Sequence, residues 1–243
     1  MSRANFKCLG LFLLFMSSIF AENNKQIIDY EISYLRIPLV NMTLTWVEDD
    51  SSVRVSYENR LKPFINFIHP VHNIYRVHFK KDDYYPLNWS KSISEGPMQF
   101  QLSARRSLDG TKVAYSNGSS LDFPETGLTV FSATHFLASK AQDPTFFPVD
   151  LPVFVDGELW EAQATRFDEQ DPHPDHHIRA GEVLIQAELH YLSGSPLLQD
   201  NDILTRHIAR EGTQFFLWVS PEGIYTKAQF DSFPRAVVLR MKK

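Results

Sequence analysis

The sequence is nearly free of cysteine: Cys8 is the only one among 243 residues, and it lies in the apolar segment at the amino terminus. One cysteine leaves no partner for an intramolecular disulfide, so the fold depends on its hydrophobic core. Hydrophobic residues make up 43% of the chain and charged residues 22%, which is typical of a globular protein. We therefore expect an ordered domain rather than a disulfide-stapled or disordered chain.

Several functional motifs are missing as well. No basic cluster occurs and the net charge is -5, so the sequence indicates neither a nucleic-acid partner nor binding to an anionic membrane surface. It contains no Gly-x-Ser-x-Gly nucleophile elbow and no glycine-rich loop before a helix. A serine nucleophile and a phosphate loop are therefore unsupported. We predict no cofactor and assign no catalytic residue.

Long apolar runs are absent except near the amino terminus, where one extends from Cys8 to Phe15. Two basic residues precede this run and Ala21 stands before a polar segment, which is the arrangement of a signal peptide cleaved after Ala21. The alternatives are an uncleaved anchor or a buried first strand, but the run is short for a bilayer span. We predict a signal peptide at residues 1–21 and a single exported β-rich domain at residues 22–243, with no membrane span after cleavage.

Alternation of apolar and polar residues predicts most of the secondary structure. Runs of period two are typical of half-buried strands, and Asp109-Gly110 and Asp156-Gly157 are strong hairpin turns. The predicted strands span residues 28–34 continuing past Pro38 to 46, 53–57, 74–79, 84–89, 98–104, 112–115, 153–155, 159–165, 183–192, 215–219, 224–230 and 236–241. The predicted short helices span residues 61–68, 128–138 and 202–210.

These strands follow one another as hairpins rather than alternating with helices, which favours an antiparallel sheet. The predicted fold class is mostly β: a curved antiparallel sheet, either an open barrel or a sandwich, with two or three short helices. Periodicity does not distinguish the barrel from the sandwich.

Four segments carry a resemblance when they are taken in order. They are LNW at residues 87–89, the predicted helix at 128–138, LPVFVDGELW at 151–160 and FLWVSPE at 216–222. Together they resemble an exported bacterial β-rich family classified as domain-of-unknown-function family 3108. The resemblance implies a bacterial envelope setting, in the periplasm. It implies no established activity and no catalytic residue.

The densest polar cluster is DPHPDHH at residues 171–177, where His173, His176 and His177 could ligate zinc or a similar metal. Two prolines forbid a regular helix, so these imidazoles do not share a helix face as in His-Glu-x-x-His sites. No distant ligand that would close a site is identifiable. We therefore favour a solvated, mobile loop without structural metal, and keep the metal site as the alternative.

Carboxylates form the second candidate cluster. Glu158, Glu161, Glu182 and Glu188 lie on predicted strands that could be neighbours. Glycosidases use two carboxylates at a set separation, which sequence does not provide. Glutamates on the outer face of an amphipathic sheet are the simpler interpretation, and we favour it.

Aromatic residues make up 13% of the chain, and its four tryptophans lie in or near predicted strands. They could line an apolar concavity or fill a solid core. We favour a non-enzymatic binding or carrier module for an apolar or amphipathic envelope molecule. The alternatives are an envelope hydrolase, with or without a metal, that uses residues 173–177, and a structural or assembly factor. No protein partner is indicated.

Overall fold

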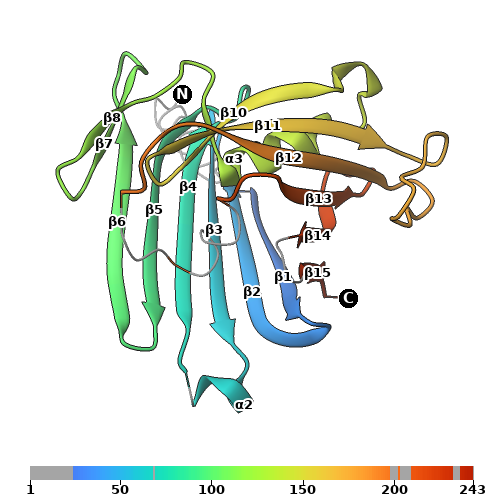
Figure 1. Ribbon diagram of the computed structural model, residues 1–243, viewed down its shortest axis with the longest axis horizontal. Helices are drawn as coiled ribbons and strands as arrows, with labels where there is room; N and C mark the ends of the chain where they lie inside the picture. The colour runs from blue at the N-terminus through green and yellow to red at the C-terminus, as the bar shows by residue number, and fades with distance from the viewer. Residues whose placement is uncertain (1–23, 68, 198–201, 203–208, 232–235, 243) are drawn as a thin grey trace, which may run out of the picture.

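All strands described in the computed structural model belong to one curved sheet (Figure 1). The structure describes residues 24–67, 69–197, 202, 209–231 and 236–242, so the predicted signal peptide lies outside the described residues. The strand order is β8-β7-β6-β5-β4-β3-β2-β1-β15-β14-β13-β12-β11-β10-β9. The predicted fold class is confirmed, and it takes the form of one curved antiparallel sheet rather than two separate sheets.

The amino-terminal half of the sheet is a meander in which each strand pairs with the next. Its elements are β1 (Asn24–Tyr34), β2 (Ile37–Glu48), β3 (Ser52–Leu61), the short helix α2 (Pro63–Asn66), β4 (His72–Lys80), β5 (Pro86–Glu95), β6 (Met98–Arg106), β7 (Lys112–Tyr115) and β8 (Ser120–Asp122). Its strands alternate as predicted: Val53, Val55 and Tyr57 are buried, whereas Arg54 between them is exposed. This alternation directs one face of the half into the interior and the other towards solvent.

One predicted strand is wrong, because the chain reverses within it. Leu35 and Arg36 both have positive φ, 57° and 67°, and they join β1 to β2 as a tight hairpin. Positive φ at two successive turn residues is usual for glycine, asparagine or aspartate. Neither residue carries that signal, so the alternation pattern continues across the turn without a visible break.

The carboxy-terminal half forms a second meander, which meets the first where β15 pairs antiparallel with β1. Its elements are β9 (Leu128–Thr129), α3 (Val130–Lys140), the single-turn helix η1 (Pro144–Phe146), β10 (Val149–Val155), β11 (Glu158–Phe167), β12 (Val183–Gly194), β13 (Thr213–Val219), β14 (Tyr225–Asp231) and β15 (Val237–Met241). β9 pairs with β10 in parallel, and the other described pairings are antiparallel. The alternation pattern does not predict β8 or β9, which are only three and two residues long.

The helix α3 lies inside the curve of the sheet (Figure 1) and confirms the helix predicted at 128–138, with a later start. Thr129 is its N-cap: its hydroxyl accepts a hydrogen bond from the Ser132 amide at 3.1 Å, and the Ser132 hydroxyl accepts one from the Thr129 amide at 2.9 Å. The buried helix residues Ala133, Leu137 and Ala138 belong to the main hydrophobic core. The third predicted helix, at 202–210, lies mostly outside the described residues.

Candidate functional site

The centre of the interior is polar despite its aromatic surroundings. His135 of α3 is buried, and its Nε2 lies 2.6 Å from the hydroxyl of Tyr57 on β3. The rings of Trp46, Phe79 and Tyr225 lie within 4.9 to 6.0 Å of the imidazole. Burial lowers the pKa of His135 to about 3 and raises the pKa of Tyr57. His135 is therefore neutral at pH 7, and one hydrogen bond joins its Nε2 to the Tyr57 hydroxyl.

An apolar cavity of about 330 Å³ lies at one end of the interior, towards α2. Its described lining residues are Ile32, Tyr34, Leu39, Val40, Asn59, Leu61, His69, Val71, Asn73, Tyr75, Glu95, Phe230 and Val237. Strands from both halves therefore contribute, next to the β1/β15 pair. The volume reaches the lower end of the range that small-molecule sites occupy.

The apolar cavity contains a small group of buried polar side chains. Asn59 and Asn73 face each other across β3 and β4, and Glu95 at the end of β5 is 5% exposed. The Asn73 amide donates to a Glu95 carboxylate oxygen at 2.6 Å, and its carbonyl oxygen accepts from the Ser94 backbone amide at 3.1 Å. The carbonyl oxygen of Asn59 is buried and has no hydrogen-bond partner among the described residues. The cavity therefore combines a mostly apolar wall with a few polar side chains, a combination that suits an amphipathic ligand.

A second cavity, of about 470 Å³, lies at the opposite ends of the same strands. Its described lining residues are Gln26, Ile28, Tyr30, Leu44, Trp46, Glu48, Tyr84, His135, Ala138, Ser139, Gln142, Pro221, Glu222, Gly223, Ile224 and Tyr225. Amide, carboxylate and hydroxyl groups occur all around this wall, unlike in the apolar cavity. The Glu48 carboxylate in it is already paired with Lys81 and accepts from the Trp46 indole at 3.3 Å.

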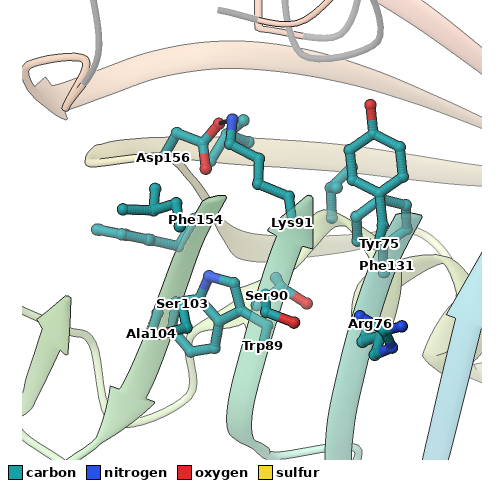
Figure 2. A pocket seen from close by; sticks show the side chains of 14 residues that line it. Tyr75, Arg76, Trp89, Ser90, Lys91, Ser103, Ala104, Phe131, Phe154 and Asp156 are labelled. Carbon is teal, nitrogen blue, oxygen red and sulfur yellow. Dashed lines mark hydrogen bonds and ion pairs between the residues drawn. The ribbon is translucent and has the colours of Figure 1, made fainter. Parts of the chain in front are cut away.

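A second junction between the two halves of the sheet is made by side chains, at a distance from the β1/β15 pair. Figure 2 shows Lys91 of β5 directed at Asp156, which stands in the turn between β10 and β11. The Lys91 ammonium forms an ion pair with Asp156, and it lies 3.0 Å from a carboxylate oxygen of Asp202. Asp202 is fully buried and accepts a second hydrogen bond, at 2.7 Å, from the Tyr75 hydroxyl. A small cavity of about 50 Å³ beside these groups is bordered by Trp89.

The histidine loop, residues 168–182 between β11 and β12, packs on the outer face of the carboxy-terminal half. The His173 and His176 rings stack at 4.8 Å, and His176 lies 4.2 Å from the Phe216 ring and 5.4 Å from that of Trp218. Trp218 donates from its indole to the His177 carbonyl oxygen at 3.0 Å. The loop thus covers aromatic side chains of β13, a role that its polar composition does not predict.

The three histidines of this loop are only partly brought together. His173 and His176 are adjacent, and His173 contacts the Gln186 side-chain oxygen at 3.1 Å through its Nε2. Across the described part of the chain, no group of three or more His, Cys, Asp and Glu side chains is arranged to hold a metal ion. Burial is the main cause that lowers the pKa of His176, and His173 adds to it.

Two of the four glutamates, Glu161 and Glu188, are neighbours beside His190, whereas Glu158 and Glu182 lie elsewhere. Glu161 lies opposite His190 across β11 and β12, and Glu188 lies 3.7 Å from the same imidazole. Glu182 accepts a hydrogen bond from Thr226 at 2.8 Å, whereas burial raises the pKa of Glu158 at the start of β11. Only Glu161 and Glu188 are therefore brought together, and Glu182 belongs to a separate polar contact.

Sequence reasoning missed the buried polar residues of the interior, although a signal exists. Asn59 continues the buried series of β3, and Asn73 begins the buried series of β4. In a period-two strand, a polar residue in register with the apolar ones faces the core. Lys91 and Glu95 occupy the same position in β5 relative to Ile93. Polar residues at inward-facing positions of the strands therefore indicate the site better than the histidine-rich cluster at residues 171–177 does.

Comparison with known proteins gives few matches. No family model matches the chain, and no curated protein matches it. One similar solved structure is a crystal structure of a β-barrel-like protein of domain of unknown function DUF1849 from Brucella abortus. It is 9% identical, the match covers 90% of this chain and 95% of that chain, and the TM-score is 0.48. Among the described residues, no helix has the length and apolar character needed to cross a membrane.

Proposed function

We propose that this protein binds an apolar or amphipathic small molecule in the apolar cavity. The observation that carries the proposal is a concavity of about 330 Å³ whose described wall is mostly Ile, Leu, Val, Tyr and Phe. Its polar side chains are few, and Asn59, Asn73 and Glu95 among them form one small group. Ligand pockets commonly have this composition, with an apolar lining and a few placed polar groups.

A hydrolase that uses the histidine loop has weaker support. Such an enzyme requires a carboxylate from elsewhere to converge on His173, His176 or His177. His176 instead packs against Phe216 and Trp218, and the Trp218 indole is bonded to the backbone of His177. These contacts support a covering role for the loop.

We also propose that the chain is exported to the periplasm after cleavage near Ala21, and that it belongs to domain-of-unknown-function family 3108. The motives are the charge and hydropathy pattern of residues 1–21 and the ordered segments that resemble the family. Amino-terminal sequencing of the protein recovered from a bacterial envelope fraction tests the export step. A mature chain that begins at Ser2 and stays with the membrane would contradict it.

Titration with the neutral, environment-sensitive dye Nile red tests the binding proposal. We expect a saturable rise in fluorescence for the wild type and its loss in Val40→Trp, because the larger side chain fills the apolar cavity. Ile28→Trp is the matched control: Ile28 is also half-buried in a strand, but it lines the second cavity. If Ile28→Trp loses binding and Val40→Trp retains it, the dye binds in the second cavity and the proposed location is wrong. No saturable binding at all would refute the proposal.

A further inference from the structure

Exposed apolar side chains gather at one end of the sheet. Nine large hydrophobic side chains are exposed among the described residues, and four of them belong to two turns that Figure 1 shows at the same end. The four, which we name the apolar tip, are Leu35 and Ile37 at the β1–β2 hairpin and Phe64 and Phe67 in and at the end of α2. Single exposed apolar residues are ordinary, but a cluster of them marks an interaction surface.

Backbone contacts hold the two turns of the apolar tip next to each other. The Lys62 amide, just before α2, donates to the Leu39 carbonyl oxygen of β2 at 2.8 Å. The Asn66 side-chain oxygen accepts from the Val71 amide at 3.2 Å, which fixes the end of α2. No residue of α2 is buried, so core packing does not account for its aromatic side chain.

The apolar tip adjoins the apolar cavity. The lining residues Leu39, Leu61 and His69 each lie two or three positions from a residue of the tip. His69 is itself exposed, so the lining of the cavity reaches the surface at this end. An apolar ligand that crosses here passes apolar side chains on its way to the interior.

The size of the apolar tip is too small for a stable protein interface. The exposed parts of its four side chains amount to roughly 500 Å², whereas each partner of a standard protein interface buries ~800 Å². Aromatic and aliphatic side chains on a projecting turn can instead enter the boundary layer of a lipid bilayer, which deforms around them.

The charge around the apolar tip also fits lipid. Residues 34–39 and 61–69, which include both turns, contain Arg36, Lys62 and His69 but no aspartate or glutamate, although the whole chain has a net charge of -5. Lys62 is paired with Glu31 at 2.6 Å, and Arg36 is exposed at the hairpin turn itself. The tip therefore presents no carboxylate of its own turns to lipid phosphates.

We propose that the apolar tip docks on the surface of a phospholipid bilayer and places the end of the apolar cavity against the lipid, so that an amphipathic ligand passes between the bilayer and the cavity. This passage rests on the proposed binding function, because the cavity is where the ligand is held. Apolar area drives the insertion, so a zwitterionic bilayer is sufficient.

Sedimentation with phosphatidylcholine vesicles tests the docking. We expect the wild type to bind, and Phe64→Ser/Phe67→Ser to bind at least about tenfold more weakly, because the two aromatic side chains no longer enter the bilayer. Leu108→Ser is the matched control and should bind like the wild type: Leu108 is fully exposed, but it lies between β6 and β7 at the opposite end of the strands. Equal binding by wild type and the double variant, or an equal loss in Leu108→Ser, would overturn the inference.

Titration with Nile red in the absence of vesicles separates this inference from the proposed function. Phe64→Ser/Phe67→Ser should bind the dye like the wild type, whereas Val40→Trp should lose the dye and keep vesicle binding, because Val40 lines the cavity outside the tip. A wild type that binds the dye but not vesicles would overturn the docking alone. A wild type that binds vesicles but not the dye would refute the proposed function and the ligand passage, and leave the docking.

Far-ultraviolet circular dichroism checks that each variant is folded. If the double variant does not fold, Phe67→Ser decides: Phe67 is 79% exposed, and vesicle binding should weaken at least about threefold. Unchanged binding in folded Phe67→Ser would then count against the docking. Analytical ultracentrifugation tests a second copy as the occupant. A wild-type dimer that the substitutions abolish, with no vesicle binding by the wild type, would overturn the proposal in favour of self-association.

Discussion

The two halves of the sheet bury their strands differently. In the amino-terminal half, β3 and β4 alternate between buried inward residues and more exposed outward ones. In the carboxy-terminal half, β13 is buried on both faces: Leu217 and Val219 face the main core, while Phe216 and Trp218 lie under the histidine loop. The amino-terminal half is thus a single wall around the interior, and the carboxy-terminal half is a thicker, two-sided layer.

This difference explains where the site lies. A one-sided wall has only its inward face to hold the fold together, so a polar residue there must have a polar partner or a function. Asn59, Asn73, Lys91 and Glu95 are all inward residues of this wall. The two-sided half carries aromatic pairs on its outer face instead, and its histidines serve that packing.

The largest expected effect comes from the side-chain junction between the halves. Lys91→Met should destabilise the protein by about 3–5 kcal/mol, because it removes the cation that faces the fully buried carboxylate of Asp202 and the partly buried one of Asp156. Arg60→Met is the control on the outer surface: it removes an exposed ion pair with Glu58 and should cost less than about 1 kcal/mol. Urea titration of both variants measures the difference. Equal costs would mean that the Lys91 ion pairs do not help to hold the two halves together.

The second effect is a pH dependence from α3, which contacts both halves through His135. Its pKa is about 3 in the folded protein against 6.5 for an ordinary histidine, so the unfolded chain binds one more proton between these values. Stability should therefore fall as pH decreases below 6.5, with His135 contributing a slope of up to about 1.4 kcal/mol per pH unit.

Urea titrations between pH 7 and 5 would isolate this contribution. His135→Gln should have a shallower slope than the wild type. Tyr57→Phe should keep the steep slope, because burial and not the Tyr57 hydroxyl lowers the pKa of His135. Identical slopes in the wild type and His135→Gln would show that the imidazole becomes protonated without unfolding.

The sequence was sufficient for the fold class and for most strands, because alternation in a one-sided wall directly reports burial. It failed at Leu35 and Arg36, where the turn is set by backbone conformation rather than by residue type. The continuous order of the sheet depends on the β1/β15 pairing, which joins residues about two hundred positions apart and leaves no local pattern. The sequence predicted an apolar concavity but not its position or volume, since these depend on how both halves of the sheet curve.

The smallest expected effect is a difference in stability between two histidine variants, one on the outer face of each half. His176 rests against Phe216 and Trp218 on the two-sided half, whereas His72 on β4 is exposed and pairs with Glu58. His176→Ala should cost about 1 kcal/mol, the scale of such aromatic contacts, and His72→Ala about 0.5 kcal/mol or less. Urea titration at pH 7.4 in the presence of a chelator measures both losses. If the two variants lose equal stability, the histidine loop does not act as a packed cover. Repeating the measurement with zinc in place of the chelator separates the metal alternative, because a metal site would stabilise the wild type and the His72 variant but not His176→Ala.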